Sequence, residues 1–263
     1  MATDDIDLQA PEFGDLYDEL PLWSAPFGLM LLDRVPLVPG SVIVDVGAGT
    51  GWLSLELAQR SGLGTTVHAV DPWGAACARL RRKLSLIGLA NVFVHEQDAS
   101  KLPLPDGAAD LVVSNLGVNN FENAPAVLAE CFRVLRPGGR IFLSTNLVGH
   151  MAEFYDVFRS VLPTTHLDAL EAHIAHRATV PKVKAQLAAA GFTPGAVAEG
   201  SFQLRYADGE ALLRHWFIRF GFLPAWIEVA GDHAEAVMQT IASHLDSEVT
   251  LTVPMACIEG IKP

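Results

Sequence analysis

The sequence lacks any long uninterrupted apolar run and any secretory leader. Half of its 263 residues are hydrophobic, yet no stretch reaches the ~18 consecutive apolar residues that a membrane-spanning helix needs. Residues Met1 to Leu8 are acidic and polar, unlike the basic start and apolar segment of a signal peptide. These absences predict a protein without a membrane span that works in the cytoplasm.

Positive charge is also scarce. The chain has 18 Lys and Arg against 30 Asp and Glu, which gives a formal net charge of −12. Because an acidic chain repels a phosphate backbone, we expect no nucleic acid among its substrates or partners. We interpret the densest basic cluster as the solvated face of a helix; it comprises Arg79, Arg81, Arg82 and Lys83.

The residues that commonly bind metals are few and poorly spaced for that purpose. Cys77, Cys131 and Cys257 form no CxxC pair, and each lies in an apolar stretch, so we expect buried, reduced thiols. His173 and His176 are three residues apart on a predicted helix, but no third ligand is evident, and we interpret them as surface residues. The sequence therefore predicts no metal site.

What the sequence does contain is a regular alternation of strands and helices between residues 41 and 145. Apolar runs such as Ser41–Val46 and Asp110–Ser114 are typical of strands buried on both faces, and helical patterns such as Gly74–Ile87 separate the strands. Pro137-Gly138-Gly139 precedes a fifth strand at Arg140–Thr145. This repetition predicts a parallel sheet with helices on both faces.

We expect a single domain over residues 1–263. Its core comprises about residues 38–146, 181–206 and 248–260, and the last two ranges include a sixth and a seventh strand. Ligands of open α/β sheets bind at the carboxyl ends of strands, where two further segments leave the core. We predict that three aromatic-rich segments cap a pocket there: about residues 13–32, 147–180 and 208–246.

The first strand runs into a glycine-rich loop, Asp45-Val46-Gly47-Ala48-Gly49-Thr50-Gly51. Glycines permit positive φ and close approach of a ligand to the backbone, and the helix that follows offers free N–H groups. The third glycine of the dinucleotide pattern G-x-G-x-x-G is replaced by Trp52, and the Gly-Lys-Ser/Thr of a P-loop is absent. The loop is therefore of a third kind, D-x-G-x-G-x-G.

Two more acids follow at the ends of the next strands. Asp71 ends VHAVD and Asp98 lies in EQDAS, so three acids are spaced 26 and 27 residues apart. A carboxylate at position 71 can accept hydrogen bonds from both ribose hydroxyls, and one at 98 suits the exocyclic amine of an adenine. Each acid alone is equally well explained as a cap or turn residue, and Asp71 alone would suit NAD. All three together favour a nucleoside site.

Four segments together resemble the motif series of the class I S-adenosylmethionine-dependent methyltransferases: VIVDVGAGTGWLSLELA, VHAVD, EQDASKLPLPDGAADLVVSN and VLRPGGRIFLSTN. Within that class they are most similar to the type 11 group, which includes ubiquinone/menaquinone C-methyltransferases. The similarity covers about residues 38–146. It implies a Rossmann-like three-layer α/β sandwich with strand order 3-2-1-4-5-7-6, an antiparallel seventh strand and, around this core, the helical cap insertions.

The resemblance also implies S-adenosylmethionine as the cofactor. The loop glycines would contact its methionine moiety, the acid after the second strand its ribose, and the acid and alanine after the third strand its adenine. The residues after the fourth strand would line the methionine end; they read Ser-Asn-Leu-Gly, without the Asn-Pro-Pro-Tyr type motif used on nucleic-acid amines. The expected cofactor site is Asp45, Gly47, Ala48, Gly49, Gly51, Asp71, Pro72, Asp98, Ala99, Asn115 and Leu116.

Methyl transfer from a sulfonium requires alignment and exclusion of water, and a general base only if the acceptor must lose a proton. Tyr17, His150 and His215 are candidate bases, although each is readily explained as a structural residue. The aromatic residues of the three cap segments favour a small apolar or aromatic acceptor. The high apolar content is compatible with a homodimer, in which additional apolar surface would be buried.

Two other functions are compatible with the same fold. A non-catalytic scaffold or regulator could bind the nucleoside without turnover, although the intact loop glycines and acids argue against it. An NAD-dependent oxidoreductase is disfavoured by Trp52 and Asp98.

Overall fold

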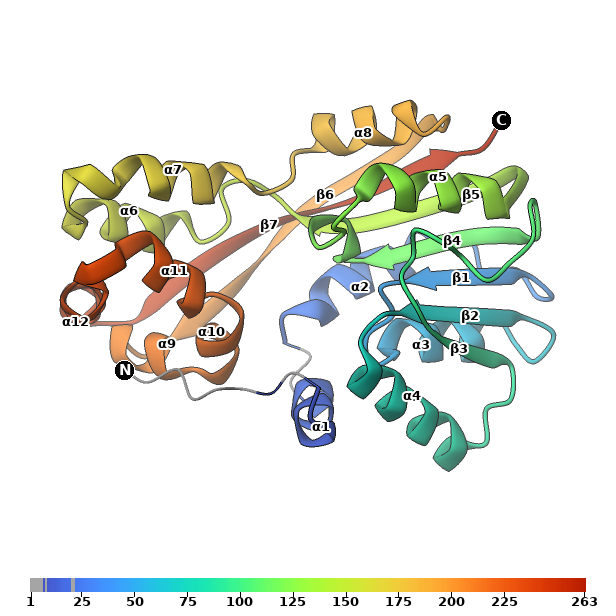
Figure 1. Ribbon diagram of the computed structural model, residues 1–263, viewed down its shortest axis with the longest axis horizontal. Coiled ribbons are helices and arrows are strands. Elements are labelled where there is room, and N and C mark those ends of the chain that lie inside the picture. The colour runs from blue at the N-terminus through green and yellow to red at the C-terminus, as the bar shows by residue number, and fades with distance from the viewer. Residues whose placement is uncertain (1–6, 8, 20–21) are drawn as a thin grey trace. The chain divides into compact units, whose positions relative to one another are not determined.

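The computed structural model describes residues 7, 9–19 and 22–263, and its central feature is a seven-stranded sheet flanked by helices (Figure 1). The strands lie in the order β3-β2-β1-β4-β5-β7-β6, which confirms the expected order. Their bounds are β1 (Val42–Val46), β2 (Thr66–Asp71), β3 (Val92–Glu96), β4 (Ala109–Asn115), β5 (Leu135–Asn146), β6 (Thr193–Tyr206) and β7 (Val249–Ile261).

The first five strands form the parallel part of the sheet. β1 pairs with β2 on one side and with β4 on the other, while β3 and β5 extend these pairs outward. Ile43, Val44 and Val46 are at most 1% exposed because both faces of β1 are covered, as its continuous apolar run predicts. The carboxyl ends of β1, β2 and β4 consequently share one edge of the sheet.

The seventh strand runs antiparallel to β5, as expected. The N–H of Gly138 donates to the carbonyl of Lys262 at 2.8 Å, and the N–H of Leu147 donates to the carbonyl of Pro254 at 3.0 Å. Residue numbers therefore rise along β5 and just beyond it while those of its partner fall.

β5 begins earlier than the expected Arg140–Thr145. Its register with β4 shifts between the pairs Ala109↔Leu135 and Leu111↔Arg140, so residues 136–139 form an excursion within the strand. Proline has no N–H to donate, and Gly138 has a φ of 74°, so this stretch cannot maintain a regular ladder. The Pro-Gly-Gly sequence therefore marks a bulge rather than the start of the strand.

Some of the helices of the core unit begin or end at ordinary capping signals. Thr179 Oγ1 accepts a hydrogen bond from the N–H of Lys182 at 3.2 Å, and Gly88 ends its helix with a φ of 68°. The bounds are α1 (Pro11–Glu19), α2 (Ser24–Leu32), α3 (Trp52–Arg60), α4 (Gly74–Ile87), α5 (Ala124–Val134), α8 (Val180–Ala189) and the 3₁₀ turn η1 (Gly117–Asn119).

The described chain divides into two compact units. The core unit comprises the described residues of 7–145 together with 179–199 and 256–263, and it contains the parallel strands. The helical unit comprises residues 146–178 and 200–255. Its elements are α6 (Ala152–Val161), α7 (Leu167–Ala175), α9 (Gly209–Arg214), α10 (Trp216–Gly221), α11 (Leu223–Ala230), α12 (Ala234–His244), η2 (Thr164–His166) and η3 (Gly231–His233).

The segments near 147–180 and 208–246 thus pack together in one unit, where α12 contacts both α6 and α11. Aromatic side chains form its interior: Trp226, Tyr155, Phe154 and Phe158 are each at most 2% exposed. The segment 13–32 belongs instead to the core unit, as far as it is described.

The basic cluster of α4 is a solvated face only in part, because Arg81 and Arg82 are exposed while Arg79 and Lys83 are partly buried against α1. Asp18 of α1 lies 2.8 Å from Arg79 and 2.7 Å from Lys83, and Asp15 pairs with Arg82. α1 therefore docks on α4 through complementary charges, a contact that the sequence pattern of α4 alone does not reveal.

Two further expectations concern the cysteines and a membrane-spanning helix. The three cysteines are buried free thiols, as expected. In the described part of the chain, no helix has the length and apolar character to cross a membrane.

Candidate functional site

The glycine-rich loop after β1 is held by hydrogen bonds within the protein. The N–H groups of Gly47 and Ala48 donate to the carbonyl of Val70 at 2.9 and 3.2 Å, and the N–H of Gly49 donates to Asp71 Oδ2 at 2.7 Å. The expectation of free N–H groups concerned the start of α3, not these three loop amides. The three amides fix the loop to the end of β2.

Open space lies beside this loop at one position. Gly47, Gly49 and Gly51 have φ of 73°, 54° and 82°, a region that favours glycine. A Cβ added at Gly49 would meet no atom within 4 Å, whereas one at Gly51 would lie 2.2 Å from the side chain of Leu80. Gly51 thus serves packing, while Gly49 leaves room for a ligand to approach the backbone.

Trp52 stands where a dinucleotide fold has its third glycine, and the structure gives it a packing role. A Cβ added at Gly28 of α2 would lie 2.2 Å from the Trp52 ring. The indole therefore requires a glycine on the helix that it packs against.

Asp71 lies at the end of β2 with both carboxylate oxygens engaged. Besides the bond from Gly49, Oδ1 accepts from the N–H of Trp73 at 2.8 Å, and the residue is 9% exposed. Burial raises the pKa of its carboxyl, opposed by these two hydrogen bonds. Burial and the nearby Asp71 charge raise the pKa of the Tyr17 hydroxyl, which keeps that hydroxyl protonated at neutral pH.

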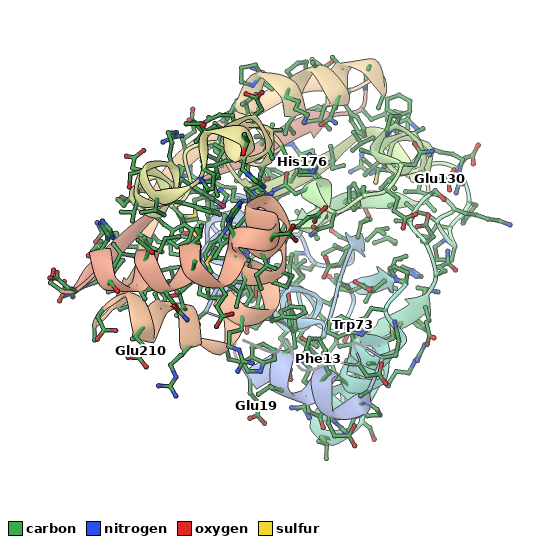
Figure 2. All side chains as sticks on the ribbon, turned by 60° about the vertical axis from the view of Figure 1, so that its left-hand side comes forward. Phe13, Glu19, Trp73, Glu130, His176 and Glu210 are labelled. Atoms are coloured by element: carbon green, nitrogen blue, oxygen red, sulfur yellow. The ribbon has the colours of Figure 1, made fainter. Side chains whose placement is uncertain are left out.

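An aromatic cluster lies beside this carboxylate, and the sequence pattern does not indicate it as a unit. The Trp73 ring centroid lies 5.2 Å from that of Tyr17 and 5.6 Å from that of Phe13, and Figure 2 labels Phe13 and Trp73 beside each other. Thr50 of the glycine loop also hydrogen-bonds Asp18 of α1. The aromatic residue two positions after Asp71 is the sequence signal that could have indicated this cluster.

Asp45, the first acid of the motif, is buried beneath the loop. It is 1% exposed, and Oδ2 accepts a 2.6 Å hydrogen bond from Ser54 Oγ. Among the described residues, Oδ1 has no hydrogen-bond partner. Burial raises the pKa of this carboxyl to about 7, with a further contribution from the Asp71 charge.

Asp98 is exposed and partly used as a turn residue. Its Oδ1 accepts from the N–H of Ser100 at 2.7 Å, which lowers the pKa of the carboxyl. The adjoining Ala99 is 7% exposed, and Pro72 is exposed. The N–H of Gln97 donates to the carbonyl of Asp71 at 3.1 Å, so the ends of β2 and β3 are tied together.

The residues after β4 complete this edge of the core unit. Asn115 Nδ2 donates to the carbonyl of Ser24 at 3.1 Å, and Asn115 Oδ1 accepts from Ser144 Oγ at 2.6 Å. Leu116 has a φ of 67°, unusual for a residue with a Cβ, and its N–H donates to the Ser144 carbonyl. A Cβ on Gly47 would lie 3.7 Å from the Cα of Gly117, so this turn adjoins the glycine loop.

The three candidate bases do not occupy one unit. Tyr17 belongs to the core unit, whereas His150 and His215 belong to the helical unit. His150 is 2% exposed, and burial, then Arg177 and His173, lower its pKa to about 3. His215 packs its ring against Tyr206 with 5.4 Å between centroids, and burial lowers its pKa.

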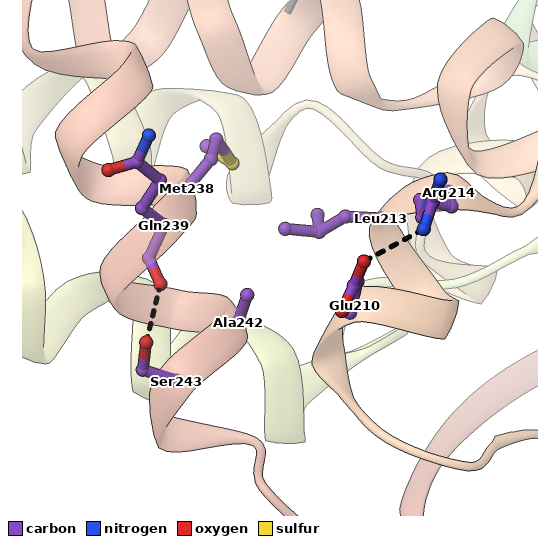
Figure 3. Close-up of a pocket in the computed structure, with 7 residues that line it drawn as sticks. All are labelled: Glu210, Leu213, Arg214, Met238, Gln239, Ala242 and Ser243. Atoms are coloured by element: carbon purple, nitrogen blue, oxygen red, sulfur yellow. Dashed lines mark hydrogen bonds and ion pairs between the residues drawn. The ribbon is translucent and has the colours of Figure 1, made fainter.

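One surface groove of the helical unit contains none of the expected site residues. It lies between α9 and α12, has a volume of about 530 Å³, and is drawn in Figure 3. Glu210 and Arg214 form an ion pair of 2.8 Å at its rim. The lining residues are Glu210, Leu213, Arg214, Met238, Gln239, Ala242 and Ser243.

Comparison with known proteins was made for sequence and for structure. Residues 44–143 match the family model described as a methyltransferase domain. Demethylmenaquinone methyltransferase of Thermus thermophilus is 42% identical over 99 residues, which cover 38% of this chain and 44% of that protein. Nocamycin O-methyltransferase of Saccharothrix syringae is 29% identical over 255 residues, covering 89% of this chain and 90% of that protein.

Coverage differs among the relatives, and the chain spans about half the length of several curated relatives that it matches. A solved structure described as a putative methyltransferase from Bacillus halodurans has a TM-score of 0.62 at 18% identity, covering 91% of this chain and 99% of that one. At that identity the likeness is one of fold. Together with the strand order and the motif series, these matches show that residues 44–143 form a methyltransferase domain of the class I S-adenosylmethionine-dependent type, similar to that of the demethylmenaquinone methyltransferases.

Proposed function

We propose that this protein transfers a methyl group from S-adenosylmethionine to a small apolar or aromatic molecule. The observation that carries the proposal is the open space beside Gly49, directly next to the fixed carboxylate of Asp71. A ligand that needs close backbone approach and a ribose acceptor would find both there.

Asp71 is the proposed ribose-binding residue. Each of its oxygens accepts one hydrogen bond from the backbone, and a carboxylate oxygen has a further lone pair available. The two backbone bonds would hold the carboxylate in place for the ribose hydroxyls. Asp98 Oδ1 accepts a hydrogen bond from the N–H of Ser100, and its other oxygen has no such bond. The Asp98 carboxylate would accept from the exocyclic amine of adenine, and the N–H of Ala99 would donate to a ring nitrogen.

The rest of the proposed cofactor site consists of small residues and turns at the same edge. Gly47, Ala48 and Gly51 shape the loop, Pro72 follows the ribose acid, and Asp45 lies below the loop. Asn115 and Leu116 would line the methionine end. Their bonds to Ser24 and Ser144 fix the turn, so this part of the site would be formed before the cofactor binds.

The bound sulfonium supplies an activated methyl group, and the protein's role is then alignment and exclusion of water. The candidate bases differ in suitability. A His150 pKa of about 3 leaves that imidazole neutral but too weakly basic to take a proton near neutral pH. Tyr17, with its raised pKa, can donate a hydrogen bond rather than accept a proton. His215 stays as the candidate base if the acceptor requires one.

The aromatic interior of the helical unit supports the proposed acceptor class. Phe154 and Trp226 stack with 3.9 Å between ring centroids, and Phe222 stacks on Trp226 at 5.8 Å. The relatives are named for different acceptors, among them nocamycin, demethylmenaquinone, a malonyl acyl-carrier protein and arsenite, so the proposed acceptor class rests on the aromatic residues alone. We further propose a cytoplasmic protein without a nucleic-acid partner, in which a single domain over residues 1–263 carries both units.

Transfer of isotopically labelled methyl from S-adenosylmethionine to small-molecule extracts would test this function. We expect labelled product from some extract fraction, and none when Gly49→Val replaces the wild type. S-adenosylhomocysteine binding without any transfer would instead favour the scaffold reading. The acceptor atom would be read from the labelled product.

A further inference from the structure

Trp73 joins the proposed ribose acid to the start of α4. Its N–H donates to Asp71 Oδ1 at 2.8 Å, and its carbonyl accepts from the N–H of Cys77 at 3.0 Å. Trp73 is the N-cap residue of α4, yet its side chain makes no capping hydrogen bond. Because N-capping favours Ser, Thr, Asp or Asn, a tryptophan at this position indicates that its ring has another role.

That ring packs against α1 (Figure 2). Its centroid lies 5.2 Å from that of Tyr17, at an interplanar angle of 82°, and 5.6 Å from that of Phe13. A Cβ added at Gly14 would lie 3.0 Å from the carbonyl oxygen of Ala75, so the backbone of α1 closely approaches the first turn of α4. The position of α1 therefore decides where the Trp73 ring lies.

α1 is too short to be a stable helix on its own. It has nine residues, whereas an isolated helix of fewer than ~12–15 residues is marginal in water. The partner helix supplies cations: Asp18 Oδ2 lies 2.8 Å from Arg79 Nε, and Asp18 Oδ1 lies 2.7 Å from Lys83 Nζ. The three side chains are only 12%, 21% and 19% exposed, so water and salt screen these ion pairs less than exposed ones.

Asp18 is the acid that both of these cations share. Partial burial alone would raise the pKa of its carboxyl, but hydrogen bonds from Lys83 and Arg79 lower that pKa, so Asp18 is ionised at neutral pH. Asp15, on the same helix, pairs with Arg82 in a more exposed position. Because exposed ion pairs contribute little, Asp18 is the main electrostatic anchor of α1.

We propose that Asp18 is a positioning residue for the ribose of the cofactor. It holds α1 on α4, α1 holds the Trp73 ring, and the Trp73 N–H holds the Asp71 carboxylate. The inference rests on the proposed function, since the ribose is that of S-adenosylmethionine. It assigns a part in cofactor recognition to an acid that lies outside all the motif segments.

The test compares S-adenosylhomocysteine with its 2′-deoxy analogue, which lacks one of the hydroxyls that would donate to Asp71. Calorimetry on the full chain gives both dissociation constants, and their ratio measures ribose recognition. In the wild type we expect the analogue to bind about tenfold or more weakly. In Asp18→Asn the ratio should fall to about threefold or less, because the amide cannot pair with two cations and Asp71 is no longer preorganised for the ribose.

Further variants separate positioning from folding. Asp18→Glu keeps the charge and should retain most of the wild-type ratio. Lys83→Gln removes one cation of the same anchor from α4, so it should lower the ratio even if Asp18→Asn does not fold. The matched control is Glu12→Gln, which removes a negative charge from an exposed position of α1 that, within the described residues, has no ion-pair partner. It should leave the ratio unchanged.

A double-variant cycle then locates the effect at Asp71. In the Asp71→Asn background, adding Asp18→Asn should change the affinity for S-adenosylhomocysteine by less than about twofold, because the carboxylate that Asp18 positions is already gone. An undiminished effect in that background, or an equal loss of affinity for both ligands in Asp18→Asn, would show a purely structural role and overturn the proposal.

The wild-type titrations separate this inference from the proposed function. A wild-type chain that binds neither ligand would overturn the proposed function. Wild-type binding with a ratio near one would take the ribose away from Asp71, and the positioning role of Asp18 with it. A ratio of tenfold that is the same in Asp18→Asn would overturn the positioning role alone.

Discussion

The core unit and the helical unit place their polar groups by different physical means. In the core unit, Asp45 and Asp71 lie at strand ends, and backbone N–H groups hold Asp71 in position. In the helical unit, the Tyr155 hydroxyl of α6 lies within hydrogen-bond distance of His173 of α7 and Trp226 of α11, so three separate segments meet there. Strand ends follow from a local sequence pattern, whereas contacts between distant helices do not. The sequence therefore predicts the polar groups at the strand ends of the core unit, but not those of the helical unit.

The largest effect should come from Gly49→Val. Valine tolerates a φ of 54° poorly, and its methyl groups would fill the open space beside the loop. We expect cofactor binding to weaken by roughly 100-fold or more while most secondary structure persists. Calorimetry with S-adenosylhomocysteine would measure the loss.

Gly62→Val is the matched control for that variant. Gly62 also has a positive φ, 82°, with no atom within 4 Å of an added Cβ, but it lies in the turn after α3. It should lose stability without losing affinity. Equal losses of affinity in the two variants would mean that backbone strain, not occupied space, explains the Gly49 result.

A smaller effect is expected from Asp71→Asn. The Asn side chain has nearly the same shape as the carboxylate, but only its oxygen can accept hydrogen bonds. The N–H groups of Gly49 and Trp73 and the ribose hydroxyls would therefore compete for that one oxygen. Affinity for S-adenosylhomocysteine should fall about 10- to 100-fold, the range for hydrogen bonds to a charged group. Unchanged affinity in a folded variant would place the ribose away from Asp71, and the exposed Asp106→Asn supplies the control.

The pH dependence of the free energy of unfolding tests whether the Asp45 carboxyl is buried with a raised pKa. Its folded-state pKa of about 7 is above the ordinary value of 3.8, so the unfolded chain releases this proton first and the stabilising contribution is lost as pH rises from about 4 to about 7. Asp45→Asn removes that dependence. Urea unfolding at pH 5 and pH 8 should show the free energy of unfolding of the wild type falling relative to the variant by about 1–4 kcal/mol. Parallel pH profiles would contradict a buried, raised carboxyl.

Residues 41–146 show how far sequence reasoning reaches. The β1 run, the glycine loop and the order of the strands follow from local patterns, because strands buried on both faces have continuous apolar sequences. The sequence predicted that Pro137-Gly138-Gly139 precedes the strand. These residues form a bulge within β5 instead, because a turn sequence does not indicate whether strand pairing continues on both sides of it. The loop amides donate to Val70 and Asp71, and nothing in the local sequence indicates these bonds.

The segment 13–32 and the cluster at Tyr155 show where it fails. Aromatic content predicted that residues 13–32 belong to a cap, whereas Phe27 and Leu31 of α2 are fully buried in the core unit. Aromatic residues pack in cores and line pockets with the same composition, so only their contacts distinguish the two. Tyr155, His173 and Trp226 carried no joint signal, because nothing in the local sequence indicates that α6, α7 and α11 meet. His173, which the sequence suggested was a surface residue, is half-buried there.

The smallest effect concerns mobility. Hydrogen exchange in the protein without ligands should be slow in β1, α3 and the buried part of α2, and faster in α6–α7 and α9–α12, which we predict to cap the pocket. Binding of cofactor and acceptor should slow exchange in the helical unit. Exchange there as slow as in β1, with no change on binding, would make these helices fixed core and remove the support for a cap.

The central claim, that the glycine loop and Asp71 form an S-adenosylmethionine site, is tested most directly by calorimetric titration of the wild-type chain. S-adenosylhomocysteine should bind at one site per chain with a dissociation constant in roughly the micromolar range. NAD should give no comparable heat, because Trp52 occupies the position of the dinucleotide glycine. Binding of NAD with no response to S-adenosylhomocysteine or S-adenosylmethionine would contradict the account.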